Sequence, residues 1–278
     1  MPFMRFFWIV FMAVTICPVL GLAGPPRDNP YDVIAKMLQP FLGVLLAENG
    51  GTNRAAEMTL VMTDVSGRLP KEMKGARLEA AVQFPDKVRL TAPVLGENVI
   101  VCRNGNEVWA VPGAKVEFLL KKFDVKPAPI KKTNTPLYLP ITPQQAVFLP
   151  AIFSVRRADV AEVGSLQGEE LRVITATLMP ELAKAIKSEG FEVRVWVADG
   201  YAPRRFDIIQ PDFTATVDVV GLRFAPSLPA TTWLPPEGVT DIYRTHADML
   251  DATLFVVMNS LGLKDNRPPG VTPPQPVP

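Results

Sequence analysis

Histidine, the commonest acid-base catalyst, is almost absent from this chain. His246 is the only one, so any Ser-His-Asp or Cys-His catalysis would have to pass through it. It falls on the polar side of an expected C-terminal helix, with Asp248 and Asp251 nearby. A histidine in such a place is usually solvated. We therefore predict a surface histidine without a catalytic role.

The two cysteines offer little more chemistry. Cys17 lies in the N-terminal apolar segment, and Cys102 follows the apolar run Val99 to Val101. A cysteine in such a run is usually a small buried hydrophobic residue rather than a nucleophile. One histidine and one remaining cysteine cannot form a tetrahedral nitrogen and sulfur site. We expect no metal and no cofactor.

Other motifs do not point to catalysis either. The acidic pair Glu169-Glu170 is typical of a solvated strand end, and Gly50-Gly51 and Asn104-Gly105 lack the spacing of a phosphate-binding loop. Two carboxylates placed for glycoside hydrolysis are not excluded by sequence, but no feature indicates them. We expect that the protein is not an enzyme.

The N-terminus predicts export. Arg5 is followed by an apolar run from Phe6 to Leu20, and Gly21 and Ala23 are the small residues that a signal peptidase requires. We expect residues 1–23 to be a signal peptide and the protein to be periplasmic. An uncleaved membrane anchor is the alternative. Removing residues 1–23 takes one of the 29 basic residues and leaves all 28 acidic ones, so the mature chain is neutral. It therefore has no excess of positive charge that would attract nucleic acid.

The periodicity of the apolar residues changes from helical to strand-like after residue 51. A 3.6-residue period predicts a helix over 29–49, interrupted by Pro40, and a two-residue period then predicts an antiparallel meander. The expected strands are 56–65, 75–84, 86–92, 97–103, 106–111, 116–120, 159–166, 169–178, 191–198, 204–210 and 213–224. Short helices are expected at 143–153 and 180–188, and a longer one over 240–261.

Two features favour a sheet with an apolar hollow. Residues 121–150 are rich in proline yet carry large apolar side chains, which predicts a lid or a packed excursion of the chain. In the strand from Phe191 to Val197, alternation places Phe191 and Val193 on one face and Trp196 on the other. A long curved sheet with few helices has more apolar area than the helices can fill, which suits an acyl chain.

Three stretches in fixed order resemble the periplasmic lipoprotein carrier family, which has the LolA/LolB-like fold. They read FPDKVRL from Phe84, ENVIVCRNGNEVW from Glu97 and WLPPEGV from Trp233. The resemblance spans roughly residues 31–243. Where the family has an arginine before the proline of the first stretch, this chain has Phe84.

The resemblance implies a mainly β fold with α-helices (α+β). It would be an incomplete antiparallel β-barrel of about eleven strands, capped by helices over a hydrophobic cavity. In that family the cavity holds the acyl chains of lipoproteins that are carried from the inner to the outer membrane, without cofactor or catalysis. The implied partners are a lipidated protein or lipid ligand, an inner-membrane donor complex and an outer-membrane acceptor. We expect a monomer.

These expectations divide the chain into a signal peptide (1–23), a half-barrel domain (24–239), a C-terminal helix (240–263) and a disordered proline-rich tail (264–278). The hypothesis is a non-enzymatic periplasmic carrier or binding protein for acyl chains or another hydrophobic ligand. The alternative is a structural or regulatory module that binds a protein partner. The predicted lining residues of the cavity and lid are Val82, Phe84, Val88, Leu90, Ile100, Trp109, Leu139, Phe148, Ile152 and Phe206.

Overall fold

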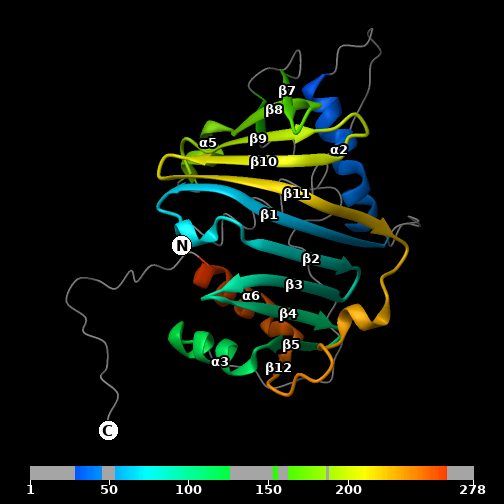
Figure 1. Ribbon diagram of the computed structural model, residues 1–278, viewed down its shortest axis with the longest axis vertical. Coiled ribbons are helices and arrows are strands. Elements are labelled where there is room, and N and C mark those ends of the chain that lie inside the picture. Colours follow the sequence, from blue (N-terminus) through cyan, green and yellow to red (C-terminus); the bar gives the residue numbers. More distant parts are fainter. Residues whose placement is uncertain (1–28, 46–53, 126–152, 156–161, 186–187, 262–278) are drawn as a thin grey trace, which may run out of the picture.

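A single antiparallel sheet of 12 strands dominates the computed structural model (Figure 1). The structure describes residues 29–45, 54–125, 153–155, 162–185 and 188–261. The strands follow the order β12-β5-β4-β3-β2-β1-β11-β10-β9-β8-β6, and β7 also pairs with β8. Because the two ends of this order do not pair with each other, the sheet stays open. This confirms the expected α+β fold with an unclosed antiparallel barrel.

Most neighbouring strands are joined by short turns, as the sequence predicted. The strands are β1 (Ala55–Gly67), β2 (Arg77–Gln83), β3 (Lys87–Val94), β4 (Glu97–Asn104), β5 (Glu107–Val111), β6 (Phe153–Val155), β7 (Glu162–Leu166), β8 (Glu169–Leu178), β9 (Glu192–Val197), β10 (Pro203–Gln210), β11 (Phe213–Ala225) and β12 (Tyr243–His246). The central pair is β1 with β11, which brings residues 55–67 beside residues 213–225.

The helices lie toward the two ends of the sheet. They are α2 (Pro30–Leu45), α3 (Gly113–Lys122), α5 (Pro180–Ala185) and α6 (Leu250–Leu261). In Figure 1, α2 lies near β8, β9, β10 and β11. The helices α3 and α6 lie at the other end of the sheet, near β3, β4, β5 and β12. No helix in the described ranges is both long and apolar enough to span a membrane.

The predicted strand at 116–120 is wrong, because this segment belongs to α3. Its buried side chains are Val116, Leu119 and Leu120, which follow the helical spacing of three and four residues. Pro112 lies directly before the first helical residue, with an extended backbone and no side-chain hydrogen bond to cap the helix.

The C-terminal helix begins later than the predicted boundary of residue 240. Residues 243–246 instead form the edge strand β12, which pairs with β5, and a 3-10 turn over 247–249 leads into α6. Strand pairing with a segment more than a hundred residues earlier overrides the local helical pattern. The predicted helix at 143–153 and the tail at 264–278 lie outside the described residues, apart from Phe153 in β6.

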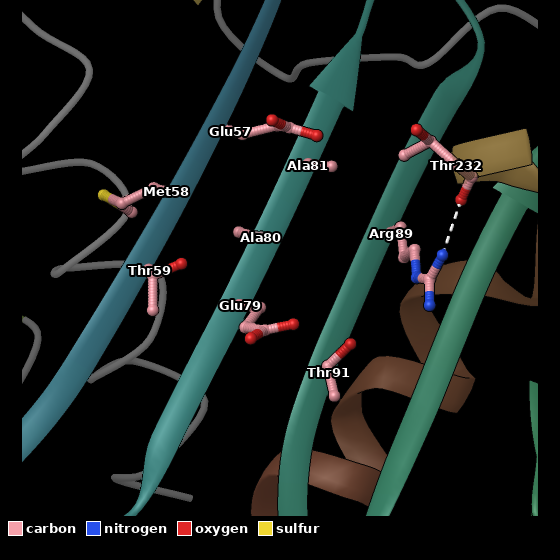
Figure 2. A pocket seen from close by; sticks show the side chains of 9 residues that line it. All are labelled: Glu57, Met58, Thr59, Glu79, Ala80, Ala81, Arg89, Thr91 and Thr232. Atoms are coloured by element: carbon pink, nitrogen blue, oxygen red, sulfur yellow. Dashed lines mark hydrogen bonds between the residues drawn. The ribbon is translucent and has the colours of Figure 1, made fainter. Parts of the chain in front are cut away.

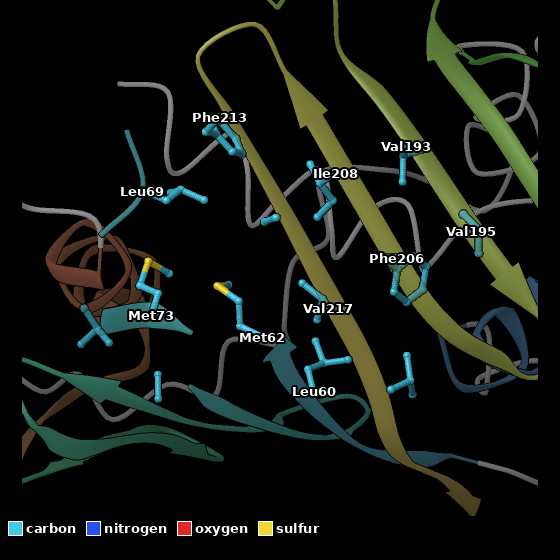
Figure 3. Packing of buried hydrophobic residues seen from close by; sticks show 14 of the residues in the cluster. Leu60, Met62, Leu69, Met73, Val193, Val195, Phe206, Ile208, Phe213 and Val217 are labelled. Carbon is cyan, nitrogen blue, oxygen red and sulfur yellow. The ribbon is translucent and has the colours of Figure 1, made fainter. Parts of the chain in front are cut away.

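One large cluster of buried apolar residues lies on one face of the sheet. We call inner the face that carries this cluster, and outer the opposite face. Side chains from β1, β9, β10 and β11 point into it, among them Leu60, Val195, Phe206 and Val217 (Figure 3). Buried residues of α2, α3 and α6 complete the cluster. Phe191, Val193, Val195 and Val197 all belong to it, which confirms the predicted alternation in that strand.

A second, smaller cluster lies on the outer face. It joins Ala81, Cys102 and Trp109 of the sheet to Leu228 and Trp233 of the segment 226–242, which connects β11 to β12. The segment is held there by Arg89, which donates from Nη1 to the carbonyl oxygen of Thr232 at 2.8 Å. The sheet is therefore covered by helices on its inner face and by this segment on part of its outer face.

Candidate functional site

The strand register places two rows of side chains across the inner face. Directly paired residues form the first row, Phe224, Ala56, Val82, Val88, Arg103 and Val108, and the second row, Leu222, Met58, Ala80, Leu90, Val101 and Ala110. These twelve residues lie on six strands that are consecutive in space, β11, β1, β2, β3, β4 and β5, and Arg103 is the only charged residue among them. Antiparallel pairing thus gathers apolar groups from residues 56 to 224 into one surface.

The middle of these rows is only half-buried. We call central stripe the six residues on β1, β2 and β3, namely Ala56, Met58, Ala80, Val82, Val88 and Leu90, all of intermediate exposure. Met58 packs against the inner cluster, while the other five belong to neither buried cluster of the described residues. An apolar stripe that the described residues leave incompletely covered is a candidate surface for a hydrophobic ligand.

The α2 end of the stripe leads into a pocket of about 350 Å³. We call it the α2 pocket. Its lining residues come from α2, from the turn between β9 and β10, and from β10 and β11: Lys36, Met37, Pro40, Gly200, Tyr201, Ala202, Pro203, Arg204, Val219, Val220, Gly221, Leu222 and Phe224. Leu222 and Phe224 are the first members of the two rows, so the pocket and the stripe share an apolar boundary.

Arg103 stands at the other end of the stripe, beside Val88. It is 4% exposed, and its Nε donates to the carbonyl oxygen of Gly105 at 3.0 Å. Burial lowers the pKa of this guanidinium, and the charges of Asp86, Asp248 and Asp251 oppose that shift. Arg103 thus brings a cation to the inner face at the edge that α6 covers.

The structure brings together only part of the predicted lining. Val82, Val88 and Leu90 lie in the central stripe. Phe84 is half-buried just beyond the end of β2, and Phe206 lies in the inner cluster on β10, 2% exposed. Leu139, Phe148 and Ile152 lie outside the described residues, so the predicted lid stays a prediction.

Ile100 and Trp109, by contrast, face away from the stripe. They pack in the outer cluster, and the indole Nε1 of Trp109 donates to the carbonyl oxygen of Trp233 at 3.0 Å. Side chains of β4 and β5 alternate between the two faces, as predicted. Ile100 and Trp109 share the outer face, however, so they do not line the stripe together with Val88. A change of one position in the assumed register exchanges the two faces.

Sequence reasoning missed Ala56, Met58 and Ala80 of the stripe and every residue of the α2 pocket. The signal for the first three was available, because each alternates with a polar neighbour such as Glu57, Thr59 or Glu79. No sequence signal could have found the pocket. Its walls come from segments more than 150 residues apart, which only the fold brings together.

The outer face carries a different pocket of about 340 Å³ (Figure 2). Its side chains are mostly polar, and the lining residues are Glu57, Met58, Thr59, Glu79, Ala80, Ala81, Arg89, Thr91 and Thr232. Both carboxylates have arginine partners, since Arg223 pairs with Glu57 at 2.6 Å and Arg77 with Glu79 at 2.8 Å. The polar lining suits an acyl chain poorly.

The prediction of a solvated His246 is wrong, because its side chain is only 1% exposed. His246 ends β12 and caps the following 3-10 turn, with Nδ1 accepting from the backbone N–H of Asp248 at 3.3 Å. Its Nε2 is buried without a hydrogen-bond partner in the described part of the chain. This arrangement provides no described serine or cysteine for the imidazole to activate.

Cys102 confirms the prediction of a buried residue. It is 0% exposed, and burial raises the pKa of its thiol to about 12. The thiol therefore stays protonated and inert at neutral pH. Across residues 29–45, 54–125, 153–155, 162–185 and 188–261, no group of three or more His, Cys, Asp or Glu side chains could hold a metal ion.

This burial gives a direct test of the outer cluster. In a Cys17→Ser chain, Cys102 is the only thiol, and we expect an aromatic disulfide reagent at mildly alkaline pH to leave it unmodified while the protein is folded. The same reagent should react fully in guanidinium chloride, because unfolding returns the thiol to its ordinary pKa. Rapid modification of the folded protein would contradict the packing of Cys102 under Trp233.

Comparison with known proteins gives low similarity. No protein-family model and no curated protein sequence matches this chain significantly. The lipoprotein LppX of Mycobacterium tuberculosis is 11% identical over 69% of this chain and 97% of its own, with a TM-score of 0.35. LprF of Mycobacterium bovis is 10% identical over 73% and 98%, with a TM-score of 0.36. A putative outer membrane lipoprotein-sorting protein domain from Vibrio parahaemolyticus is 10% identical over 70% and 97%, with a TM-score of 0.26. Similarity at this level does not decide function, which has to follow from the site itself.

Proposed function

We propose that this protein is a non-enzymatic carrier or binding protein for acyl chains of lipoproteins or another hydrophobic ligand, and that it works in the periplasm. The central stripe is the observation that carries the proposal. It presents six half-buried apolar side chains on the inner face of an open sheet, and it continues into the α2 pocket. A freely diffusing carrier further requires that residues 1–23 be removed as a signal peptide.

Affinity in such a site comes from removing the ligand from water. Each acyl methylene that the stripe buries contributes about 0.8 kcal/mol, so a dozen methylenes offset the loss of translational freedom and of chain flexibility. The stripe supplies no hydrogen-bonding side chain between Phe224 and Arg103. Such a surface selects for length and apolarity rather than for one defined chain.

Replacing Val88 by asparagine should lower the affinity for a fluorescent fatty acid about tenfold, because the amide removes apolar contact and is poorly solvated beneath a bound chain. Titration with the fluorescent ligand measures this loss. Val61→Asn is the matched control, since Val61 is also half-buried in a strand but lies on the outer face, opposite Asp218. Equal losses in both variants would contradict binding on the inner face.

The native ligand can be identified directly. Protein purified from its own host under mild conditions should carry lipid that organic extraction and mass spectrometry detect. Val88→Asn protein prepared in parallel should carry less. Native and delipidated protein with identical mass spectra, together with no binding of any fatty acid, would argue against a carrier.

A protein-interaction module remains the second candidate, and a specific surface favours it. Leu95 and Phe118 are both 58% exposed, and Lys115 of α3 donates from Nζ to the carbonyl oxygen of Leu95 at 3.2 Å, which places the two side chains on neighbouring elements. The C-terminal helix is less suitable, because Thr253, Val256 and Val257 are buried. If Val88→Asn complements a deletion strain and a Leu95→Ser, Phe118→Ser double variant does not, partner binding is the better function.

A further inference from the structure

We infer that the α2 pocket binds the anionic headgroup of an amphiphile whose acyl chain lies on the central stripe. This inference rests on the proposed function and narrows its ligand class from any hydrophobic molecule to one with an anionic terminal headgroup. Its two supports are the charge of the pocket wall and the continuity of the pocket with the stripe.

The pocket wall is basic. Lys36 and Arg204 line it, and none of the described lining residues is acidic. Arg204 pairs with Glu169, whose carboxylate lies 3.5 Å from Nε, which is too far for a good hydrogen bond, and both side chains are nearly half exposed. Such an exposed pair contributes little, so the guanidinium can turn toward a ligand at small cost.

Tyr201 gives the wall a defined shape. Its hydroxyl accepts from Lys36 Nζ at 3.0 Å, and the same ammonium lies 4.7 Å from the centre of the ring. The guanidinium of Arg172 lies 5.7 Å from that ring and pairs with Asp199. Because the hydroxyl oxygen accepts from Lys36, its own hydrogen can be donated to an oxygen of the headgroup. The pocket thus offers donors on a positively charged wall, which is the arrangement that an anion requires.

Apart from Lys36, Tyr201 and Arg204, the residues that line the pocket are apolar. Met37 is 2% exposed, and Phe41 holds the ring of Phe224 edge-on with the ring centres 4.9 Å apart. Phe224 pairs with Ala56, and Leu222 with Met58, so a chain that leaves the headgroup site meets the central stripe at once. A charged end and an apolar path in this order match a single amphiphile rather than two separate ligands.

The outer pocket makes the contrast clear. It has a similar volume, but its lining includes Glu57 and Glu79, which hold their arginine partners Arg223 and Arg77, and its mostly polar side chains offer no apolar path for an acyl chain. The same sheet therefore separates a pocket suited to an anionic amphiphile from one unsuited to it.

Three ligands of equal chain length test the inference: palmitate, hexadecyl phosphate and 1-hexadecanol, each used below the concentration at which it aggregates in water, to displace a fluorescent probe. We expect the unmodified protein to bind both anions about tenfold more tightly than the alcohol, with the difference falling as salt is added. A Lys36→Met, Arg204→Met double variant should lose this difference and keep its affinity for the alcohol. Lys36→Arg, which keeps the charge, should retain most of the difference.

The matched control removes the same two residue types elsewhere. In Lys74→Met, Arg68→Met protein, the lost cations are exposed partners of Asp64 and Asp212 on other surfaces, and the difference between anion and alcohol should persist. Urea unfolding of each variant, and its unchanged affinity for the alcohol, separate a lost headgroup contact from a damaged fold.

The possible outcomes separate the inference from the proposed function. Equal affinity of the unmodified protein for all three ligands would overturn the headgroup site and leave the carrier function standing. Failure of all three to bind would overturn both. Inorganic phosphate in large excess should displace little probe, because most of the affinity comes from the chain; efficient displacement would indicate a site for free anions and overturn the amphiphile.

Discussion

Replacing Trp109 with alanine should lower the free energy of unfolding by about 3–5 kcal/mol, the usual cost of removing a large aromatic side chain from a core. Trp109 is 1% exposed and is packed in the outer cluster with Cys102 and Trp233. Its loss leaves a cavity and also removes the hydrogen bond from Nε1 to the carbonyl oxygen of Trp233. Urea denaturation followed by circular dichroism measures the change.

A second variant separates the cost of the cavity from the cost of the lost hydrogen bond, and a third serves as the control. Trp109→Phe keeps most of the ring volume and should cost about 1–3 kcal/mol, mainly for the unpaired carbonyl group. Trp196→Ala is the matched control, because Trp196 is a half-buried tryptophan of the same outer face whose Nε1 donates to Asp207 at 2.8 Å. Equal losses from Trp109→Ala and Trp196→Ala would show that the segment 226–242 does not depend on Trp109.

The packing of Trp109 also bears on the proposed ligand site, although Trp109 does not line it. Cys102 and Trp109 pack against the segment 226–242 on the outer face, while their chain neighbours Val101 and Ala110 are buried on the inner face. If the segment 226–242 packs less tightly on the outer face, β4 and β5 should loosen before the central stripe on β1 to β3 changes. We therefore expect the affinity of Trp109→Phe protein for a fluorescent fatty acid to remain within about twofold of the unmodified value.

Gly67→Ala should destabilise the protein by about 2–5 kcal/mol, because the new methyl group has no space and the backbone conformation disfavours it. Gly67 ends β1 with a φ of +71°. A Cβ atom there would lie 2.2 Å from the carbonyl oxygen of Asp212 and 2.7 Å from the Cα of Phe213. Both contacts are to backbone at the start of β11, so relief requires the central strand pair to separate locally. Thermal or urea unfolding measures the loss.

Gly75→Ala is the matched control for this prediction. Gly75 has a similar φ of +84°, but a Cβ atom there would meet nothing within 4 Å. It should therefore show only the conformational cost of about 1–2 kcal/mol. If the two variants unfold at the same denaturant concentration, the close approach of β1 and β11 at Gly67 is not a source of stability.

The sequence by itself determined most of the strands and their inward and outward side chains. Alternation over 191–198 correctly separated Val193 and Val195 from Trp196, and the run around Cys102 correctly indicated burial. These properties are local, because a strand reverses its side chains at every residue regardless of what covers it. The antiparallel sheet followed from many such strands joined by short turns, whereas its open edge was an expectation from the family resemblance.

Only the tertiary structure decided which face of the sheet carries the candidate site. Ile100 and Trp109 were expected to line the cavity together with Val88, yet they lie under the segment 226–242 on the outer face. Alternation states which residues share a face, but it does not state which element will cover that face. The burial of His246 and the strand at 243–246 have the same origin, since both depend on pairing with β5.

The α2 pocket depends on the fold most completely. Lys36, Tyr201 and Phe224 are separated by up to 188 residues in the chain, and no local pattern relates them. They meet because β1 pairs with β11 and because α2 packs where Phe41 contacts Phe224. The sequence thus determined an apolar face of the sheet, and the long-range pairing of its strands decided where charged and apolar groups come together in the proposed site.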